Sequence, residues 1–221
     1  MKNFKAIIFD MDGLLLDSER IALNAFTETL HHFDLEPDNE LFKRCIGTNA
    51  EMSGKIVREG LQDKVDHAAF NKIWDQKHTE KTTDKPIPLK TGVTELLAHI
   101  KEIKIPAAVA TSTKTHKAEH KLRNADILDV FSFIVGGDQV ERSKPHPDIY
   151  LKAAEKLGAN PRNCLAFEDS ENGVKSAFAA DLTVVQVPDL VAPSPSLKQL
   201  GHIIVDSLLD VLSYDFKKEK Q

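Results

Sequence analysis

The amino-terminal segment constrains the fold of this chain more than any other stretch. Its apolar run, Ala6 to Phe9, is too short for a helix of its own and is rich in residues that favour strands. Such a run is typical of a strand buried on both faces, as in a parallel sheet. It ends in Asp10 and Asp12, and Gly13 lets the backbone leave the strand at dihedral angles that other residues resist. Carboxylates at the carboxyl end of a buried strand lie where open α/β sheets bind ligands, although Asp-x-Asp-Gly also occurs in solvated turns.

The rest of the chain has two parts with different patterns. Residues 15 to 85 carry apolar side chains at helical spacing and contain no predicted strand. Beyond them we predict strands at 106–111, 133–136, 164–167, 183–187 and 203–205, and helices at 92–103, 115–124, 147–157 and 171–180. This alternation implies right-handed crossovers and a parallel sheet, whose first strand is separated from the others by a helical insert. An insert directly behind the two aspartates predicts a lid over a site.

Composition excludes several classes of protein. The formal net charge of -5 argues against a nucleic-acid protein whose affinity rests on a basic surface. No segment approaches the ~20 apolar residues of a membrane span. Cys45 and Cys164 have no metal-like spacing, and Cys164 lies in an apolar run, which indicates that Cys164 is a buried free thiol and that the compartment is a reducing cytoplasm. We therefore expect a cytoplasmic protein that binds neither nucleic acid nor membrane.

Three later segments add polar groups near predicted strand ends. Thr111 and Ser112 could hold an anion through their hydroxyls and backbone N–H groups, or could be an ordinary helix cap. Lys144 precedes two prolines and could act as a point charge for phosphate, or could be solvated in a loop. Glu168 and Asp169 could complete a cation site, or Asp169 could cap the next helix.

The order of these groups is more informative than any one of them. A parallel sheet brings its strand ends to one edge, so acids, hydroxyls and a lysine would meet there. Acids for a cation, a lysine and hydroxyls for an anion, and a nucleophile between them are the groups that phosphoryl transfer requires.

On these motifs the sequence resembles the haloacid dehalogenase superfamily, specifically its β-phosphoglucomutase-like branch. The motifs are Phe9–Glu19, Ala110–Ser112, Lys144–Asp148 and Phe167–Gly173. The resemblance covers nearly the whole chain. It implies an α/β fold in which a Rossmann-like, doubly wound parallel sheet (residues 1–14 and 88–221) carries an inserted all-helical cap domain (residues 15–87).

The resemblance also implies a mechanism. Asp10 would be the nucleophile that forms an aspartyl-phosphate, which water then cleaves. Asp12 would be the general acid and then the base, with a pKa raised towards neutrality. One Mg²⁺ would be held by Asp10, the Asp12 backbone carbonyl and Asp169, with Glu168 as a direct or water-mediated ligand.

The phosphate and the rest of the substrate have separate expected partners. Thr111, Ser112 and Lys144 would hold the non-bridging phosphate oxygens, and Lys144 would also steady Asp10. Glu19 and Asn49 are our candidates for substrate specificity. The resemblance implies an enzyme acting on a sugar phosphate or a nucleoside monophosphate, with Mg²⁺ as its cofactor. We expect it to be a monomer.

Two cap positions favour a phosphatase over a mutase. The mutase of this branch grips its distal phosphate with a cap arginine, assisted by a histidine, and the matching residues here are Ala50 and Ala22. A phosphomutase with another anchor, Lys55 or Arg58, remains an alternative. A non-catalytic phosphate sensor is a further alternative, although such a protein would be expected to lack the nucleophile or the acid.

The histidines and the single tryptophan are predicted to have structural rather than catalytic positions. We expect the histidines at positions 31, 32, 67, 78, 116 and 120 to lie on solvated helix surfaces. We expect Trp74 to belong to the core of the cap rather than to a stacking platform for substrate.

Overall fold

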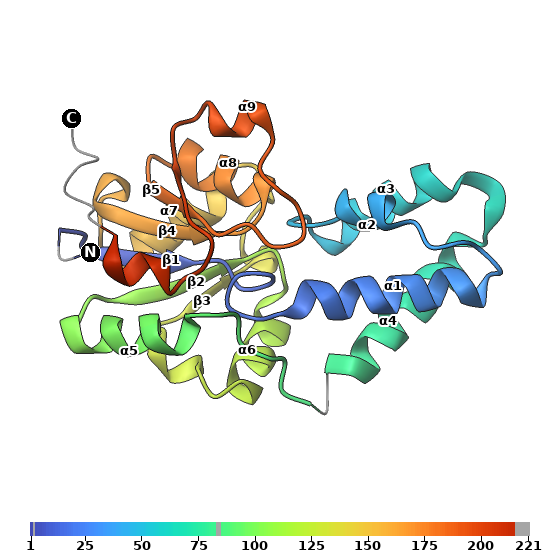
Figure 1. Ribbon diagram of the computed structural model, residues 1–221, viewed down its shortest axis with the longest axis horizontal. Coiled ribbons are helices and arrows are strands. Elements are labelled where there is room, and N and C mark those ends of the chain that lie inside the picture. The colour runs from blue at the N-terminus through green and yellow to red at the C-terminus, as the bar shows by residue number, and fades with distance from the viewer. Residues whose placement is uncertain (2, 83–84, 215–221) are drawn as a thin grey trace.

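The structure, a computed structural model, describes residues 1, 3–82 and 85–214. One six-stranded sheet lies at its centre, with strand order β3-β2-β1-β4-β5-β6 (Figure 1). The strands are β1 (Ala6–Phe9), β2 (Ala107–Thr111), β3 (Ile134–Gly136), β4 (Cys164–Glu168), β5 (Thr183–Gln186) and β6 (Ile203–Ile204). Every neighbouring pair is parallel. From β1 the chain first adds β2 and β3 on one side of the sheet and then β4, β5 and β6 on the other. Such a switch point opens a crevice at the carboxyl ends of the strands.

Helices cover both faces of the sheet, as the sequence pattern predicts. They are α5 (Val93–Ile103), α6 (Thr115–Asn124), α7 (Asp148–Lys156), α8 (Glu171–Ala179) and α9 (Pro195–Lys198). Side chains of α5 and α6 pack with Ile7 and Phe9 of β1 in one apolar core. Side chains of α7, α8 and α9 pack with Ala6 and Ile8 in the other. Alternate residues of β1 therefore supply opposite cores, which is why the whole run is apolar.

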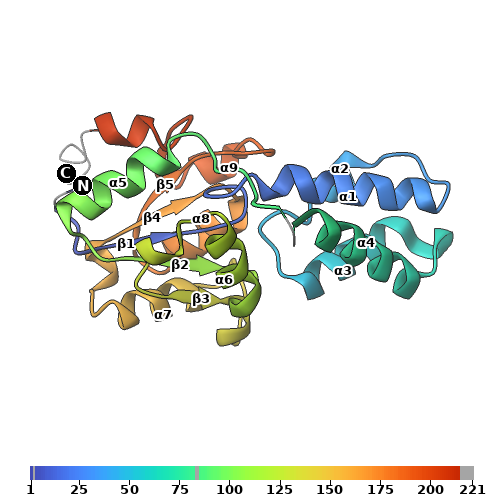
Figure 2. The same cartoon turned by 90° about the horizontal axis from the view of Figure 1, so that it is seen from below.

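The predicted helical insert forms a separate group with its own core. It contains α1 (Ser18–His32), α2 (Asn39–Lys43), α3 (Ala50–Leu61) and α4 (His67–Thr82). Figures 1 and 2 show these helices gathered beyond the end of the sheet where β1 ends. Phe26 lies at the centre of this core, with ring-centroid distances of 5.8 Å to Phe70 and 5.1 Å to Trp74. Trp74 packs against this core, as predicted, but it is only partly buried and also lines the cavity described below.

Two chain segments join the insert to the sheet, and they bond to each other. The backbone N–H of Asp17 donates to the Pro88 carbonyl at 2.8 Å, and that of Lys90 donates to the Leu15 carbonyl at 3.0 Å. The side chain of Asp189, which follows β5, accepts from Lys90 at 2.5 Å and from Arg20 of α1 at 2.8 Å. These bonds therefore hold the insert against the sheet domain at the place where the two connecting segments run side by side.

The predicted strands and helices agree with the observed ones to within a few residues at their ends. The doubly wound parallel sheet is confirmed. In the described ranges, no helix combines the length and the apolar composition that crossing a membrane requires.

Candidate active site

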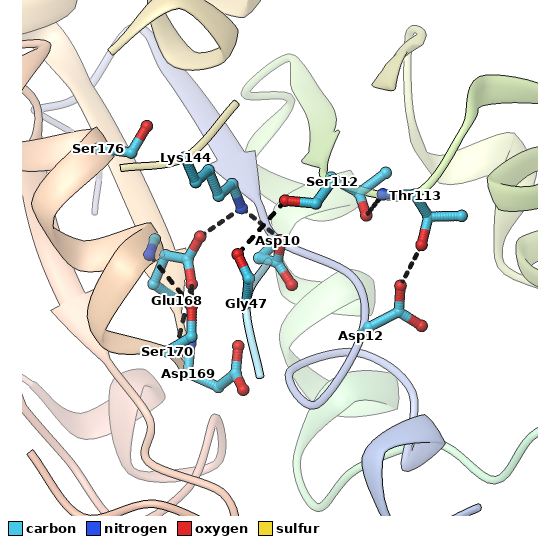
Figure 3. Close-up of polar contacts among 12 residues, drawn as sticks. Asp10, Asp12, Gly47, Ser112, Thr113, Lys144, Glu168, Asp169, Ser170 and Ser176 are labelled. Carbon is cyan, nitrogen blue, oxygen red and sulfur yellow. Dashed lines mark hydrogen bonds and ion pairs between the residues drawn. The ribbon is translucent and has the colours of Figure 1, made fainter. Parts of the chain in front are cut away.

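Three strand ends bring the predicted site residues together. Phe9 of β1 pairs with Val109 of β2 on one side and with Phe167 of β4 on the other. Asp10 directly follows β1, and the ends of β2 and β4 lie on either side of it (Figure 3). The backbone N–H of Asp10 donates to the Phe167 carbonyl at 2.9 Å, which fixes where the Asp10 side chain leaves the sheet.

Three buried carboxyl groups converge at this edge. Asp10, Glu168 and Asp169 each offer an oxygen, and these oxygens lie within 4.8 Å of one another. Their exposed fractions are 7%, 0% and 4%. Residues separated by more than 150 positions therefore share one small volume, as a common cation would require.

Lys144 neutralises part of this cluster. Its Nζ donates to Asp10 Oδ1 and to Glu168 Oε1, both at 2.5 Å. The hydroxyl of Tyr150 donates to the same Glu168 oxygen at 2.6 Å. Lys144 is buried and acts as the counter-ion of Asp10 and Glu168. It is not among the described residues that line the cavity discussed below.

One ammonium group does not balance three carboxyl groups, and their pKa values reflect this. Burial, opposed by Lys144 but reinforced by Glu168, raises the pKa of Asp10 to about 7. Burial, then Asp10 and Glu168, raise the pKa of Asp169 well above its usual value. Burial would lower the pKa of Lys144, but Asp10 and Glu168 raise it above its usual range. An oxygen-only donor set with excess negative charge suits a hard divalent cation such as Mg²⁺.

Asp12 differs from our expectation. Its carboxylate accepts from Ser18 Oγ, Thr113 Oγ1 and Lys121 Nζ, each at 2.7 Å. Figure 3 shows it pointing to Thr113 rather than to Asp10. Burial alone would raise the pKa of Asp12, but Lys121 and the two hydroxyls outweigh burial and lower the pKa to about 2. The expected rise towards neutrality is therefore wrong for this arrangement.

The hydroxyl groups at the end of β2 lie at the same edge. Thr111 is buried, and its Oγ1 accepts from the backbone N–H of Thr113 at 3.1 Å. Ser112 Oγ lies 3.5 Å from the Gly47 carbonyl of the insert. Both residues line a cavity together with Asp10 and Asp12.

This cavity, of about 400 Å³, lies between the strand ends and the helical insert. Glu19, a candidate for specificity, lines it, and burial followed by the charge of Asp12 raises the pKa of Glu19 to about 8. Ala22 and Ala50 also line it. Lys55 and Arg58, the alternative anchors of a mutase, are not among the described lining residues.

Asn49, the other candidate for specificity, has a different position. It is the N-cap of α3, where its side-chain oxygen accepts from the backbone N–H of Met52 at 2.9 Å. Its Nδ2 donates to Ser143 Oγ of the sheet domain. Asn49 is not among the described residues that line the cavity, so its observed contacts are those of a helix cap and a bridge between the two parts of the chain.

Several cavity residues were not predicted as such. Thr113 and Lys121 bind Asp12, and His78 of α4 lines the cavity, which corrects our expectation of a solvated helix surface. Burial and the nearby Lys121 lower the pKa of His78. The hydroxyl run Thr111-Ser112-Thr113 was a signal for Thr113, but helical spacing alone does not identify which lysine of α6 faces Asp12.

Known proteins resemble this chain in sequence and in structure. The family model for haloacid dehalogenase-like hydrolases matches residues 7–187. The chain is 35% identical, over 180 residues, to the phosphorylated carbohydrates phosphatase of Thermotoga maritima, with 80% of this chain and 82% of that protein covered. It is 30% identical, over 222 residues, to hexitol phosphatase B of Escherichia coli K12, with 95% of each covered.

A solved structure agrees with these matches. CbbY from Rhodobacter sphaeroides, in complex with xylulose-1,5-bisphosphate, superposes with a TM-score of 0.76 at 26% identity, and the match covers 94% of this chain and 96% of that one. The family model spans well over half of the present sequence, including β2 to β5 and all of β1 except its first residue. The chain therefore belongs to the haloacid dehalogenase-like hydrolase family.

Proposed function

We propose that this protein is a Mg²⁺-dependent phosphatase that hydrolyses a small phosphorylated metabolite, a sugar phosphate or a nucleoside monophosphate, through an aspartyl-phosphate on Asp10. The observation that carries the proposal is the position of Asp10. Its carboxyl group lies at the wall of a cavity, is bound by buried Lys144 at 2.5 Å, and lies within 4.8 Å of oxygens from two further acids. The names of the phosphatase relatives support the same reaction class.

In the first step, a carboxylate oxygen of Asp10 attacks phosphorus, and the bond between phosphorus and the leaving oxygen breaks. The leaving oxygen takes a proton and departs as an alcohol. In the second step, water attacks the phosphoryl group on Asp10, which releases inorganic phosphate and restores the carboxylate. Lys144 favours the ionised form of Asp10 that the first step requires, because it donates directly to that carboxyl group.

The residues present fit a magnesium ion. The carboxylates of Asp10 and Asp169 would hold it together with the backbone carbonyl of Asp12, and Glu168 would contribute directly or through water. When bound, Mg²⁺ supplies the positive charge that offsets repulsion between the Asp10 carboxylate and the phosphate.

Asp12, Thr111 and Ser112 have supporting roles in this proposal. Asp12 gives a proton to the leaving oxygen and later takes one from water. Because its carboxylate is held by Ser18, Thr113 and Lys121, this role includes breaking at least one of those contacts. Thr111 and Ser112, at the end of β2, donate to non-bridging phosphate oxygens.

Two alternatives are weaker. A phosphomutase needs a cation for the distal phosphate, but Ala50 and Ala22 line the cavity where the resemblance leads one to look for it. A regulatory protein that only binds a phosphorylated metabolite would not need both Asp10 and Asp12.

We assign residues 1–14 and 88–221 to the catalytic domain and residues 15–87 to the cap. The enzyme acts as a monomer in the cytoplasm. Both cysteines are free and buried, as suits a reducing compartment.

The central test is Asp10→Asn, which keeps the shape of the side chain and removes its nucleophilic charge. Phosphate release from p-nitrophenyl phosphate in Mg²⁺ is expected to fall at least about 10³-fold, because the covalent route is lost. Exposed Asp129→Asn is the matched control and is expected to retain turnover. Normal, Mg²⁺-dependent turnover by the Asp10→Asn protein would refute the proposal.

A second test addresses Asp12. Asp12→Ala is expected to slow the hydrolysis of a sugar phosphate, which has a poor leaving group, by about 10²–10⁴-fold. Hydrolysis of an activated aryl phosphate should be slowed much less. An equal loss for both substrates would contradict the acid role.

A further inference from the structure

One face of helix α4 forms a polar wall of the cavity. Asn71, Asp75 and His78 are spaced by four and three residues, so they lie on the same side of the helix, and all three line the cavity. Together they present an amide, a carboxylate and an imidazole. These are groups that donate to or accept from hydroxyls.

Other cavity residues of the insert have a different character. Ala22, Phe42 and Cys45 line the cavity with apolar surface. Phe42 is only 2% exposed and packs on Phe26, at 5.7 Å between ring centroids. Polar residues of the insert outside α4 also line the cavity, but the hydroxyls of two of them, Thr48 and Ser53, bond to each other at 2.7 Å. Helix α4 therefore supplies an amide, a carboxylate and an imidazole from one face.

No cationic anchor for the substrate comes from the described part of the insert. Among the described residues of the insert that line it, the ionisable acids are Glu19 and Asp75, and there is neither a lysine nor an arginine. His78 has a lowered pKa because of burial and of Lys121, so it is largely uncharged at neutral pH. Lys121 of α6 does line the cavity, but its Nζ lies 2.7 Å from Asp12 and so serves the reacting end.

A second phosphate or a carboxylate on the substrate would therefore meet Glu19 and Asp75 and no cation among the described lining residues of the insert. The partner of Asp75 is Lys117 of α6, at 3.7 Å, which is exposed and is not among those lining residues. Hydroxyl groups, by contrast, would meet hydrogen-bonding partners on α4. The cavity volume of about 400 Å³ lies within the range of sites for small metabolites.

We propose that Asn71, Asp75 and His78 of α4 bind the hydroxyl groups of an uncharged, polyhydroxylated leaving group, so that the substrate is a sugar or polyol carrying one phosphate and no other anionic group. This inference rests on the proposed phosphatase function and narrows it. The proposed substrate differs from the ligand of CbbY, a protein of similar fold whose solved complex contains a sugar with two phosphates.

The first measurement is the selectivity of the wild-type enzyme in Mg²⁺. Its substrates are glucitol 6-phosphate, fructose 1,6-bisphosphate, 2-phosphoglycolate, uridine 5′-monophosphate and p-nitrophenyl phosphate. We expect kcat/KM for glucitol 6-phosphate to exceed that for the bisphosphate, the phosphoglycolate and the nucleotide by at least about tenfold each. A preference for any of these three over glucitol 6-phosphate would overturn the inference.

The second measurement assigns the preference to α4. Asn71→Ala and Asp75→Asn are each expected to lower the ratio of kcat/KM for glucitol 6-phosphate to kcat/KM for p-nitrophenyl phosphate by about tenfold, mainly through KM. Lys72→Ala, an exposed residue of the same helix that is not among the described lining residues, is the matched control, with the ratio unchanged. An unchanged ratio in both cavity variants overturns the inference. If the wild type releases no phosphate from any substrate, the phosphatase proposal itself has failed.

Discussion

Replacing Gly173 with alanine would test how tightly the acid cluster is held. Gly173 lies in α8, directly beside Glu168. A methyl group built there would lie 1.9 Å from Glu168 Cδ, whereas real contacts are essentially never shorter than 3.0 Å. The neighbour is a fully buried carboxyl group rather than the end of a flexible surface chain. Glu168 must therefore move by roughly 1 Å or more, because the surrounding core is closely packed.

The cost follows from what Glu168 binds. Its carboxyl oxygens accept from Lys144 Nζ at 2.5 Å and Tyr150 OH at 2.6 Å, and from the backbone N–H of Asp169 at 3.2 Å. Overpacking typically costs about 1–3 kcal/mol, and disturbing a buried ion pair costs about 3–5 kcal/mol. Because the two effects act on one group they do not add, and we expect Gly173→Ala to lower the free energy of unfolding by about 3–5 kcal/mol. A displacement of that size next to Asp10 should also reduce kcat by about 10²-fold.

Urea unfolding, with phosphate release measured on the same preparations, would test both numbers. Gly54→Ala is the matched control for stability, because Gly54 lies in helix α3 and its added methyl would meet nothing closer than Asn71 Nδ2 at 3.8 Å. It should be neutral or more stable by up to about 1 kcal/mol. If Gly173→Ala unfolds at the wild-type urea midpoint with the same slope, the Glu168 network is not constrained as described.

Three further changes test the charges around the cavity. Lys144→Met leaves two buried carboxylates without their counter-ion, so the free energy of unfolding should fall by about 3–5 kcal/mol, and adding Mg²⁺ should restore part of it in urea titrations. Ala50→Arg adds the missing cation, so KM for fructose 1,6-bisphosphate should fall about tenfold in steady-state assays. Lys121→Met removes the contact that holds the pKa of Asp12 at about 2, below the roughly 3.9 of an unfolded aspartate, so the variant should be about 2–3 kcal/mol less stable at pH 7. That difference should shrink as the pH falls from about 4 towards 2, where wild-type Asp12 also becomes protonated, and urea unfolding at pH 7 and pH 3 would show no such change if the ion pair is unimportant.

The fold could be predicted almost entirely from local sequence patterns. The run Ala6–Phe9 is apolar at every position because its side chains alternate between two cores, and only a sheet covered on both faces requires that. The absence of a strand pattern in residues 15–85 likewise identified the insert, because helical periodicity is a local property. The parallel register then brings the ends of β1, β2 and β4 together, and so Asp10, Thr111 and Glu168 could be placed at one edge.

The cavity could be predicted only in part, because its walls depend on how two separately folded groups face each other. Helical spacing shows that Asn71 and His78 share a face of α4, but not whether that face points to solvent or to Asp10. Asn49 illustrates the converse, since its place in a motif-like stretch suggested substrate contact, whereas the chain uses it as the N-cap of α3. Residues whose roles depend on the docking of the insert are therefore the ones that sequence patterns describe least well.

The two aspartates of the first motif show why residue type and spacing do not determine a proton affinity. Burial raises the pKa of Asp10 to about 7, because Lys144, which Asp10 shares with Glu168, opposes burial only in part and the Glu168 charge adds to the rise. Asp12, only two positions later, has Lys121 and two hydroxyls for its own carboxylate, so its pKa is lowered to about 2. Lys121 comes from α6, 109 residues further along the chain, and nothing in the local sequence marks it as the partner. The acid role that we propose for Asp12 must therefore involve separation from Lys121, since a carboxylate that keeps this ion pair has no proton to give at neutral pH.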